Sequence, residues 1–354
     1  MQILLAMTMA ASSEAMTMAA PRSSELAARL QGAPRLGLGM AALGRPGYIN
    51  LGHDQDLPAK DVEAMRVQAH EVLDEAYRLG LRYIDCARSY GLSEEFVASW
   101  LAKQTADVAA AMVCGSKWGY EYTAAWRIQV EDGEAHEVKK HTVEQHERQL
   151  GETRSILGDK LHLYQIHSAT EASGVLEAPD VLAVLGKLRD QGVAVGASVS
   201  HPQAKPLELA AAATSPGDGK PLFASVQATY NLLDQSAGPF LEAAAAQGVF
   251  VIVKEGVANG RLTARNVGSD TLAILEAEAG KLSTTVDALA LAWILTQPFV
   301  GMVLSGASTC EQLRQNCDAL RLAPLDPALH ERLSKALGQD CEQYWQDRRN
   351  LSWN

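Results

Sequence analysis

The chain has 354 residues, of which 47% are hydrophobic and 21% charged. This composition is typical of a soluble globular protein with a large core, and it excludes wholesale disorder. The 31 lysines and arginines face 42 aspartates and glutamates, which leaves a formal net charge of −11. A chain this acidic repels nucleic acid and anionic membranes, and it has no apolar run of the roughly 18 residues that a transmembrane helix needs. We therefore expect no nucleic-acid partner and no membrane partner.

Residues 1–33 form a leader ahead of the first regular pattern. The first basic residue of the leader is Arg22, so it lacks the basic start of a secretory signal. We expect it to be disordered, with a weak organelle-targeting stretch as the alternative. The five cysteines of the chain are scattered and contain no CxxC pair. This pattern indicates reduced thiols rather than disulfides or zinc ligands, and it favours a cytoplasmic protein.

From Pro34 onward, short runs rich in β-branched residues alternate with longer Ala- and Leu-rich runs of helical period. The expected strands are Arg35–Met40, Arg82–Cys86, Ala111–Ser116, Leu161–Ile166, Ala194–Val199, Ala224–Ala228, Val249–Val253 and Gly301–Leu304. The expected helices are Val62–Leu79, Ser93–Lys103, Val138–Leu157, Pro179–Gln191, Pro206–Ala213, Gly238–Gln247, Thr284–Thr296 and Cys310–Leu320. Gly80, Gly192 and Gly248 each stand between a helix and a strand, where a helix C-terminal glycine is expected. Ser93 is placed to cap its helix.

The strict alternation of strands and helices predicts a parallel sheet, and eight strands predict a closed (β/α)8 TIM barrel over residues 34–325. The competing open, doubly wound sheet usually carries GxGxxG after its first strand, whereas Gly37, Gly39 and Gly44 have a different spacing. Long loops follow the first and third strands, at 47–59 and 118–137, and belong to the C-terminal face of the barrel. Residues 326–354 are expected to form a C-terminal helix and a Trp-containing tail that pack on the barrel.

Polar side chains stand at the carboxyl ends of three neighbouring strands, where the active site of such a barrel lies. Asp85 ends the second strand, and Tyr90 follows it. Lys117 ends the third strand and His167 the fourth. Taken singly, each of these residues is more often a surface, packed or core residue. All four together are harder to explain in that way, because charged groups at a crowded barrel mouth need partners.

These four residue types suit the reduction of a carbonyl group. A tyrosine with its usual pKa of about 10 is a poor acid–base catalyst near neutrality, and a lysine cation beside it lowers that pKa. A carboxylate can hold the lysine charged and in position, and a histidine can steer the carbonyl oxygen. The hydride has to come from a cofactor, because no side chain supplies one.

Three segments in this order resemble a known family. YIDCARSYGLSEE, GSKWG and LGDKLHLYQIHS are similar to the aspartate–tyrosine segment, the lysine strand and the histidine strand of the aldo/keto reductases. The resemblance runs from about Leu36 to Leu320. It implies an NAD(P)(H)-dependent oxidoreductase that interconverts an aldehyde, ketone or sugar and the corresponding alcohol. It also implies that Asp85, Tyr90, Lys117 and His167 form a catalytic tetrad, in which Tyr90 is the general acid and base.

The same resemblance implies where NAD(P)(H) binds, extended across the barrel mouth. Ser198 and Gln227 match residues that hold the carboxamide, although Val199 replaces an asparagine of the family pattern. The residues that match the pyrophosphate loop are Gly256, Asn259, Gly260 and Leu262, and Lys254 is a further candidate for contact with the cofactor. Lys254 stands where the family normally places an aromatic residue on the nicotinamide.

The adenosine end of the cofactor site is implied by the segment VLSGASTCEQLRQN. Its matching residues are Gly306, Ser308, Gln312 and Asn316. Backbone N–H groups open a helix there, which suits an anion. Many relatives have Arg or Lys near the 2′-phosphate, whereas this chain has the hydroxyls of Ser305, Ser308 and Thr309 and, nearby, Arg314. NADP(H) is therefore favoured only slightly over NAD(H).

Aromatic residues of the loop after the third strand are candidates for the substrate end. Trp118, Tyr120 and Trp126 either contact the substrate or pack against neighbouring loops. Two other classes of function stay open, namely a barrel lyase with a Schiff-base lysine at Lys117 or Lys254 and a non-catalytic, nicotinamide-binding regulatory or redox-sensing subunit. The particular carbonyl compound, the physiological direction and the oligomeric state stay open as well.

Overall fold

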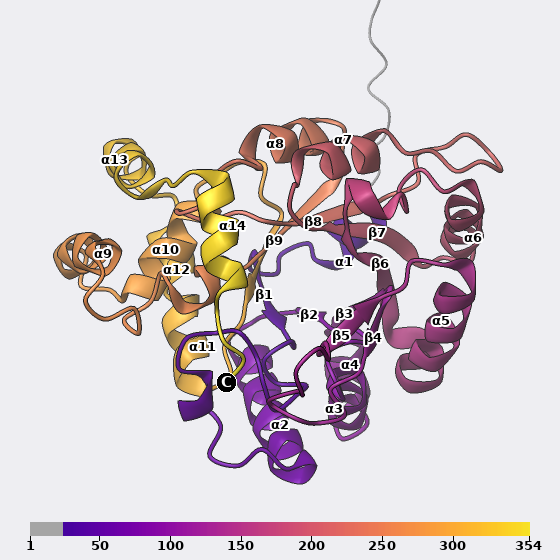
Figure 1. The fold of residues 1–354 in the computed structure, drawn as a ribbon, viewed down its shortest axis with the longest axis horizontal. Helices are drawn as coiled ribbons and strands as arrows, with labels where there is room; N and C mark the ends of the chain where they lie inside the picture. The colour runs from indigo at the N-terminus through magenta and orange to yellow at the C-terminus, as the bar shows by residue number, and fades with distance from the viewer. Residues whose placement is uncertain (1–23) are drawn as a thin grey trace, which may run out of the picture.

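Eight parallel strands close into a barrel at the centre of the computed structural model, which describes residues 24–354 (Figure 1). Around the barrel the strands follow the order β1, β10, β9, β8, β7, β6, β3, β2. Their bounds are β1 Leu36–Gly39, β2 Tyr83–Asp85, β3 Val113–Trp118, β6 Leu161–Ala169, β7 Ala194–Val199, β8 Ser225–Thr229, β9 Phe250–Lys254 and β10 Met302–Ser305. Each overlaps a strand expected from the sequence, and the predicted (β/α)8 TIM barrel is confirmed.

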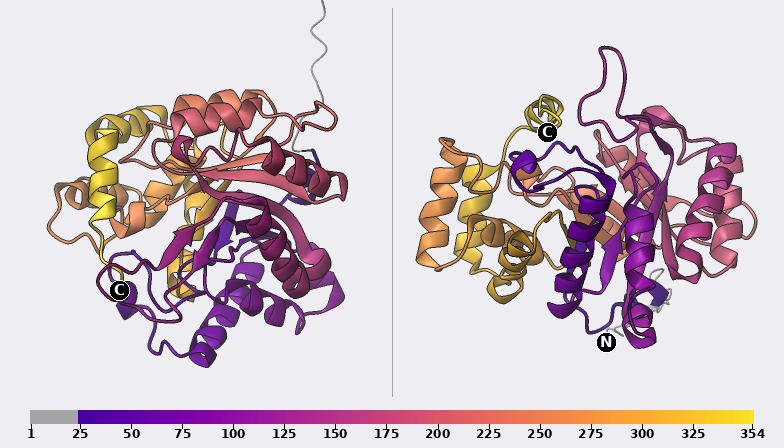
Figure 2. Two further views of the ribbon diagram at one scale, coloured as in Figure 1. Left: turned by 45° about the vertical axis from the view of Figure 1, so that its right-hand side comes forward. Right: turned by 90° about the horizontal axis from the view of Figure 1, so that it is seen from below.

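Helices cover the outside of the barrel and connect its strands (Figure 2). They are α2 Val62–Arg78, α3 Ser93–Leu101, α4 Ala106–Ala111, α5 Val143–Leu157, α6 Pro179–Asp190, α7 Ala204–Ala212, α8 Gly238–Ala246, α9 Asp270–Lys281, α10 Val286–Leu295, α11 Cys310–Cys317 and α12 Ala319–Leu322. The sequence pattern does not predict α4 and α9. The reason is that α4 is short and buries no residue, while α9 buries only Leu272, Leu275 and Ala279.

Two local expectations are wrong. The helix expected from Val138 begins only at Val143, because Glu137–Lys139 forms strand β5, which pairs with β4 Tyr120–Tyr122 in an antiparallel hairpin. Ser93 does not cap α3, since it is the first residue of the helix and its hydroxyl donates to the Ala87 carbonyl at 3.2 Å. Three glycines expected after helices do adopt positive φ angles, 91° at Gly80, 88° at Gly192 and 80° at Gly248.

The amino-terminal end of the barrel is closed by a helix, α1 Ser24–Arg29. Leu26 and Leu30 lie four residues apart and pack among side chains of the barrel interior, which are Tyr83, Val113, Leu163, Ile252, Met302 and Leu304. The sequence placed this segment in a disordered leader. Burial of the two leucines accounts for the difference, because it offsets the entropy cost of ordering the segment. Residues 1–23 of the leader lie outside the described residues.

The C-terminal segment 326–354 packs on the barrel as two helices, α13 Pro327–Leu337 and α14 Cys341–Arg349, followed by a short tail. In Figure 1, α14 crosses the face of the barrel that carries the carboxyl ends of the strands. It is fixed there by Trp345, whose Nε1 donates to Asp234 Oδ2 at 3.0 Å. Asn231 Nδ2 also donates to the Tyr344 hydroxyl at 3.0 Å. Within residues 24–354, no helix is long and apolar enough to cross a membrane.

Candidate active site

The four side chains of the predicted tetrad meet at the carboxyl ends of β2, β3 and β6. Lys117 Nζ forms an ion pair with the Asp85 carboxylate and donates to the Tyr90 hydroxyl at 3.3 Å. On its other side, the Tyr90 hydroxyl lies 3.4 Å from His167 Nε2. Lys117 is 0% exposed, whereas Asp85, Tyr90 and His167 line a cavity. The phenol therefore stands between a buried cation and an imidazole at the cavity wall.

The Asp85 carboxylate is held by more than the lysine. Its Oδ1 accepts hydrogen bonds from Gln227 Nε2 at 3.0 Å and from the Tyr83 hydroxyl at 3.2 Å. Gln165 Nε2 lies at the limit of hydrogen bonding, 3.4 Å away. Lys117 therefore faces a fixed anion. Gln227, which the resemblance assigns to the carboxamide, lines the cavity, and its amide donates this hydrogen bond to Asp85.

His167 is neutral in this setting. Burial lowers the pKa of its imidazole well below the usual value, and the cations of Lys117 and Lys254 lower it further. Ser89 Oγ lies 3.2 Å from Nδ1. A hydroxyl that donates to Nδ1 leaves the imidazole proton on Nε2, the nitrogen that faces Tyr90. The sequence reasoning missed Ser89, although this serine precedes Tyr90 in the motif.

The expectation that Lys117 lowers the pKa of Tyr90 is wrong for the protein alone. Removal from water raises the pKa of this phenol well above its usual value of 10.0, and the negative charge of Asp85 raises it further. The nearby Arg45 guanidinium lowers the pKa of Tyr90, but by less than burial and Asp85 raise it. Because Lys117 is paired with Asp85, its charge is largely compensated. Tyr90 is therefore a protonated phenol at neutral pH.

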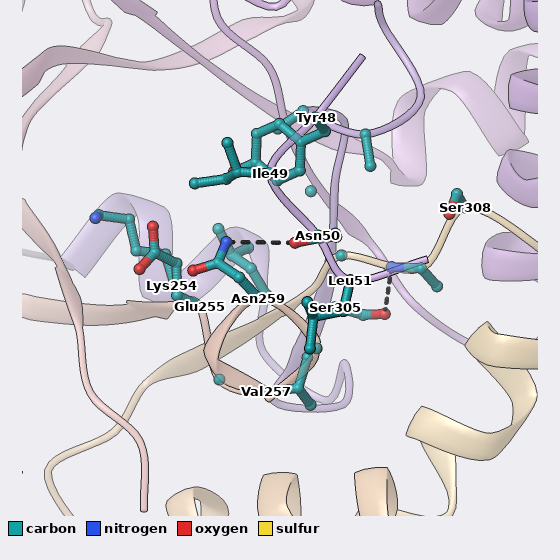
Figure 3. Close-up of a pocket in the computed structure, with 18 of the residues that line it drawn as sticks. Tyr48, Ile49, Asn50, Leu51, Lys254, Glu255, Val257, Asn259, Ser305 and Ser308 are labelled. Carbon is teal, nitrogen blue, oxygen red and sulfur yellow. Dashed lines mark hydrogen bonds between the residues drawn. The ribbon is translucent and has the colours of Figure 1, made fainter. Parts of the chain in front are cut away.

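A cavity of about 450 Å³ runs along the barrel mouth from the tetrad to the start of α11. One wall is the segment Tyr48–Leu51, and the facing wall is formed by Lys254, Glu255 and the loop after β9 (Figure 3). Asn259 Nδ2 donates to Asn50 Oδ1 at 3.3 Å, and Leu51 N donates to the Asn259 carbonyl at 3.0 Å. Hydrogen bonds thus connect the insert 47–59 to the loop that the resemblance assigns to a pyrophosphate.

Lys254 and Glu255 form a charged group at the middle of the cavity. Lys254 Nζ donates to Thr229 Oγ1 at 3.0 Å, and removal from water lowers the pKa of this amine to about 8. Glu255 is paired with Arg348 of α14, with Arg348 Nε 2.9 Å from Oε2. Burial alone raises the pKa of the Glu255 carboxyl, but the charges of Arg348 and Lys254 outweigh it and hold the pKa at about 2. Sequence reasoning singled out Lys254 and missed the pair beside it.

The residues assigned to the pyrophosphate loop play different structural parts. A Cβ on Gly256 would lie 2.8 Å from Leu291 Cδ2, so this glycine lets the loop pack against α10. Gly260 has a φ of 90° and lies against Leu51 of the insert, where only glycine is unstrained. Asn259 lines the cavity, whereas Leu262 is fully buried in the core and does not line it.

The residues assigned to the carboxamide and to the adenosine differ in exposure. Ser198 is fully buried, and it is not among the cavity-lining residues. Gly306, Ser308, Gln312 and Asn316 all line the far end of the cavity. Within residues 24–354, Ser198 Oγ and the Oδ1 atoms of Asn259 and Asn316 are buried without a hydrogen-bond partner. Such atoms are costly unless a ligand or water satisfies them.

Two charged residues at the adenosine end escaped the sequence reasoning. Asp56, from the insert after β1, pairs with Arg265, from the segment between β9 and α9. Both side chains line the cavity beside Ser308. The only sequence signal was the Asp-containing insert itself, since partners 209 positions apart cannot be read from local pattern.

None of the three aromatic residues assigned to the substrate lines the cavity. Trp118 is the last residue of β3 and is buried against His146, with ring centroids 4.9 Å apart. Trp126 packs on Phe96 and donates from Nε1 to the Lys60 carbonyl at 2.8 Å. Tyr120 meets the His167 ring edge-on at 5.0 Å but does not line the cavity. These placements favour packing for both tryptophans.

Other side chains form the tetrad end of the cavity. They are Arg45, Tyr48 and, from the tail, Trp353. The Arg45 guanidinium carbon lies 4.8 Å from the centroid of the Trp353 ring and 5.4 Å from that of Tyr90. The C-terminal tail therefore helps to wall this end of the cavity. Among the residues that the structure describes, no group of His, Cys, Asp or Glu side chains could hold a metal ion.

Comparison with known proteins gives the family. The model of the aldo/keto reductase family matches residues 35–337. The NADH-specific methylglyoxal reductase of Escherichia coli is 25% identical over 341 residues, which cover 86% of this chain and 95% of that protein. The uncharacterized oxidoreductase YqkF of Bacillus subtilis is 25% identical over 277 residues, 71% of this chain and 82% of the relative.

Solved structures show the same fold. The holo form of an aldo-keto reductase from Bacillus halodurans matches with a TM-score of 0.62 and 22% identity, over 86% of this chain and 91% of that one. A putative aldo-keto reductase of Pseudomonas matches with a TM-score of 0.56 and 22% identity, over 81% and 90%. The chain belongs to the aldo/keto reductase family and is an oxidoreductase. Enzymes of this family use nicotinamide cofactors and act on small molecules.

Proposed function

We propose that this oxidoreductase interconverts an aldehyde, ketone or sugar and the corresponding alcohol, with Tyr90 as general acid and base. The observation that carries the proposal is the position of the Tyr90 hydroxyl, 3.3 Å from Lys117 Nζ and 3.4 Å from His167 Nε2 at the cavity wall. Three neighbouring strands supply these groups to one point, which is the usual place of a barrel active site.

Tyr90 donates the proton in reduction and accepts it in oxidation. In reduction, its O–H gives the proton to the carbonyl oxygen, and the raised pKa keeps the phenol protonated until then. The Lys117 ammonium stabilises the phenolate that remains after the transfer, and Asp85 keeps the ammonium in place. In oxidation, the phenolate takes the proton from the alcohol. The neutral His167 imidazole donates from Nε2–H to the same substrate oxygen and so positions it.

A nicotinamide dinucleotide supplies or accepts the hydride when it is bound. The unpartnered Oδ1 atoms of Asn259 and Asn316 support such a ligand, because both residues line the cavity and neither oxygen has a protein donor among residues 24–354. At Gly306 a Cβ would meet only open space, which leaves room beside the start of α11. The residues that line the cavity and would hold the dinucleotide are Gln227, Lys254, Gly256, Asn259, Gly260, Gly306, Ser308, Gln312 and Asn316.

The competing Schiff-base reaction is less well supported. A Schiff-base lysine must be a neutral amine, whereas Lys117 is held in a buried ion pair with Asp85. Lys254, whose pKa of about 8 permits a neutral fraction, lies in the charged group with Glu255 and Arg348.

The test is a measurement of turnover with a panel of carbonyl compounds and both reduced dinucleotides. The panel begins with a 2-oxoaldehyde, because one relative is named as a methylglyoxal reductase. We expect loss of the reduced dinucleotide and formation of the alcohol in equal amounts. Binding of neither dinucleotide would contradict the proposal. A mass increase after borohydride treatment with a carbonyl compound, lost in Lys254→Met, would favour the lyase instead.

A further inference from the structure

We propose that Asp56 makes this enzyme prefer NADH to NADPH, by placing a fixed carboxylate where the 2′-phosphate of NADPH would lie. The inference rests on the proposed function, because it concerns the dinucleotide that the same cavity takes. It reverses the slight preference for NADP(H) that the sequence pattern favours.

The geometry places the Asp56 carboxylate on the residues assigned to the adenosine end. Asp56 follows the short helix η1 His53–Gln55 in the insert, and its side chain is 6% exposed. Ser308 Oγ donates to Oδ2 at 2.9 Å, and Gln312 Nε2 donates to Oδ1 at 2.8 Å. These are the hydroxyl and amide that the family resemblance assigns to the adenosine and 2′-phosphate. In this chain both groups donate hydrogen bonds to the Asp56 carboxylate.

Arg265, the cation at this end of the cavity, is already engaged. Its guanidinium pairs with both oxygens of Asp56, with Nη1 2.9 Å from Oδ2. The same Nη1 donates to the carbonyls of Leu51 and Gly52 at 3.0 Å. Turning this arginine toward a phosphate would leave a buried carboxylate without its cation and would break the contacts of the insert, both of which are costly.

The carboxylate is charged at neutral pH. Burial raises the pKa of Asp56, but the hydrogen bonds from Arg265, Gln312 and Ser308 outweigh it and lower the pKa below its usual value. Two further titratable groups of the surroundings add no positive charge. Burial lowers the pKa of His53, 4.0 Å away, to about 4, and it raises the pKa of Asp287 to about 6.

Two more distant charged side chains affect the pKa of His53. Lys60 lowers the pKa of His53, and Asp54 raises it. The positive charge of Arg265 is compensated by the negative charge of Asp56. Asp287 is ionised above about pH 6, so this end of the cavity carries no net positive charge above that pH. A phosphate monoester carries about −1.5 to −2 charges near neutrality, and it would meet a carboxylate at close range. The 2′-hydroxyl of NADH is neutral and donates readily to a carboxylate or amide oxygen.

Asp56 also ties the insert to the barrel, and a purely structural role makes a different prediction. If Asp56 only holds the loop, its replacement weakens NADH and NADPH alike. If its charge selects the dinucleotide, the replacement changes the ratio of the two affinities. The ratio, rather than either dissociation constant, is therefore the quantity to measure.

The experiment is calorimetric titration of the full chain with NADH and with NADPH at one ionic strength. We expect wild-type protein to bind NADH at least about tenfold more tightly, and Asp56→Asn to lower that ratio by about tenfold or more. Asp54→Asn is the matched control, since it removes the same charge from an exposed site in the same insert. Its ratio should equal that of the wild type.

A second measurement needs no variant. Adenosine 5′-monophosphate and its 2′-phosphorylated form probe the adenosine end alone, and we expect the unphosphorylated nucleotide to displace bound dinucleotide at a lower concentration. The opposite order would overturn the inference. So would equal or tighter binding of NADPH by the wild type, or a ratio that is the same in Asp56→Asn and Asp54→Asn. Binding of neither dinucleotide would overturn the proposed function and this inference with it.

Discussion

At the scale of single residues, the Tyr90 phenol is held in its acid form by its surroundings. Burial and the negative charge of Asp85 raise its pKa, and the ion pair with Asp85 compensates most of the Lys117 charge. A phenol of this kind is a poor source of protons to water. It becomes a good donor to a carbonyl oxygen that gains negative charge as the carbon is reduced, since Lys117 and His167 lie next to the oxygen that loses the proton.

The direction of this pKa shift predicts different pH profiles for the two directions of the reaction. Reduction needs the protonated phenol, which is present at all pH values below the raised pKa. We expect kcat/KM for reduction to stay flat between about pH 6 and about pH 9, and kcat/KM for oxidation of the alcohol to rise over that range. Steady-state rates in both directions across this range test the assignment. A reduction rate that falls between about pH 7 and about pH 9 would contradict it.

The sequence allowed the tetrad to be predicted because local motifs carry it. Asp85, Tyr90, Lys117 and His167 each lie near the carboxyl end of a strand, and the order of parallel strands brings such positions together. Asp56 and the pair Glu255–Arg348 were out of reach. Their partners lie 209 and 93 positions away, in segments whose local pattern shows only a loop or a helix.

At the scale of elements, α14 is attached to the cavity wall through a charge pair. Arg348 of α14 binds Glu255, the residue directly after β9, and the two side chains are 25% and 8% exposed. Tyr344 and Trp345 of α14 also form hydrogen bonds with the segment after β8. The C-terminal helix therefore joins two neighbouring strand–helix units at the mouth of the barrel.

Removal of the arginine should destabilise the protein, because it leaves a mostly buried carboxylate without its cation. We expect Arg348→Ala to lower the free energy of unfolding by roughly 2–3 kcal/mol at neutral pH, as measured by chemical denaturation. Arg321→Ala is the control, since Arg321 and Asp318 form a pair that is 78% and 39% exposed. That variant should lose less than about 0.5 kcal/mol.

The same pair predicts an acid-sensitive part of stability. Glu255 has a pKa of about 2 in the folded protein against 4.5 for the ordinary side chain, so its contribution is complete above pH 4.5 and is lost as pH falls toward 2. In Arg348→Ala the folded pKa rises, and the slope of stability over this interval should become shallower. An Arg348→Ala protein with wild-type stability and slope would contradict this account of α14.

Two of the missed features, the helix α1 and the hairpin of β4 and β5, have a common physical cause. Strands and amphipathic helices of the barrel carry their burial pattern in their own residues, and these were predicted. The helix α1 and the hairpin of β4 and β5 are short, and contacts made after the barrel closes hold them in place. Short elements lack the number of periodic positions from which a pattern can be read.

At the scale of the whole molecule, a chain with a net charge of −11 has a cavity that is lined by as many cations as carboxylates. The cations are Arg45, Lys254, Arg265, Arg348 and Arg349, and the carboxylates are Asp56, Asp85, Glu137, Glu255 and Asp287. The cavity reaches from the tetrad on β2, β3 and β6 to the start of α11 after β10, and so runs along a large part of the barrel mouth. Such a surface offers charged and polar partners along the length of an extended ligand, and the tetrad lies at one end of it.

The central claim is that Tyr90 exchanges the proton with the substrate oxygen, and Tyr90→Phe tests it most directly. The variant keeps the ring and loses only the hydroxyl, so the cavity should keep its shape. The measurement pairs turnover of a carbonyl substrate with binding of the reduced dinucleotide, in wild type and variant. We predict a fall in kcat of at least about a hundredfold, with the dissociation constant of the dinucleotide changed less than about threefold. A variant that binds the dinucleotide and keeps most of the wild-type kcat would contradict the account.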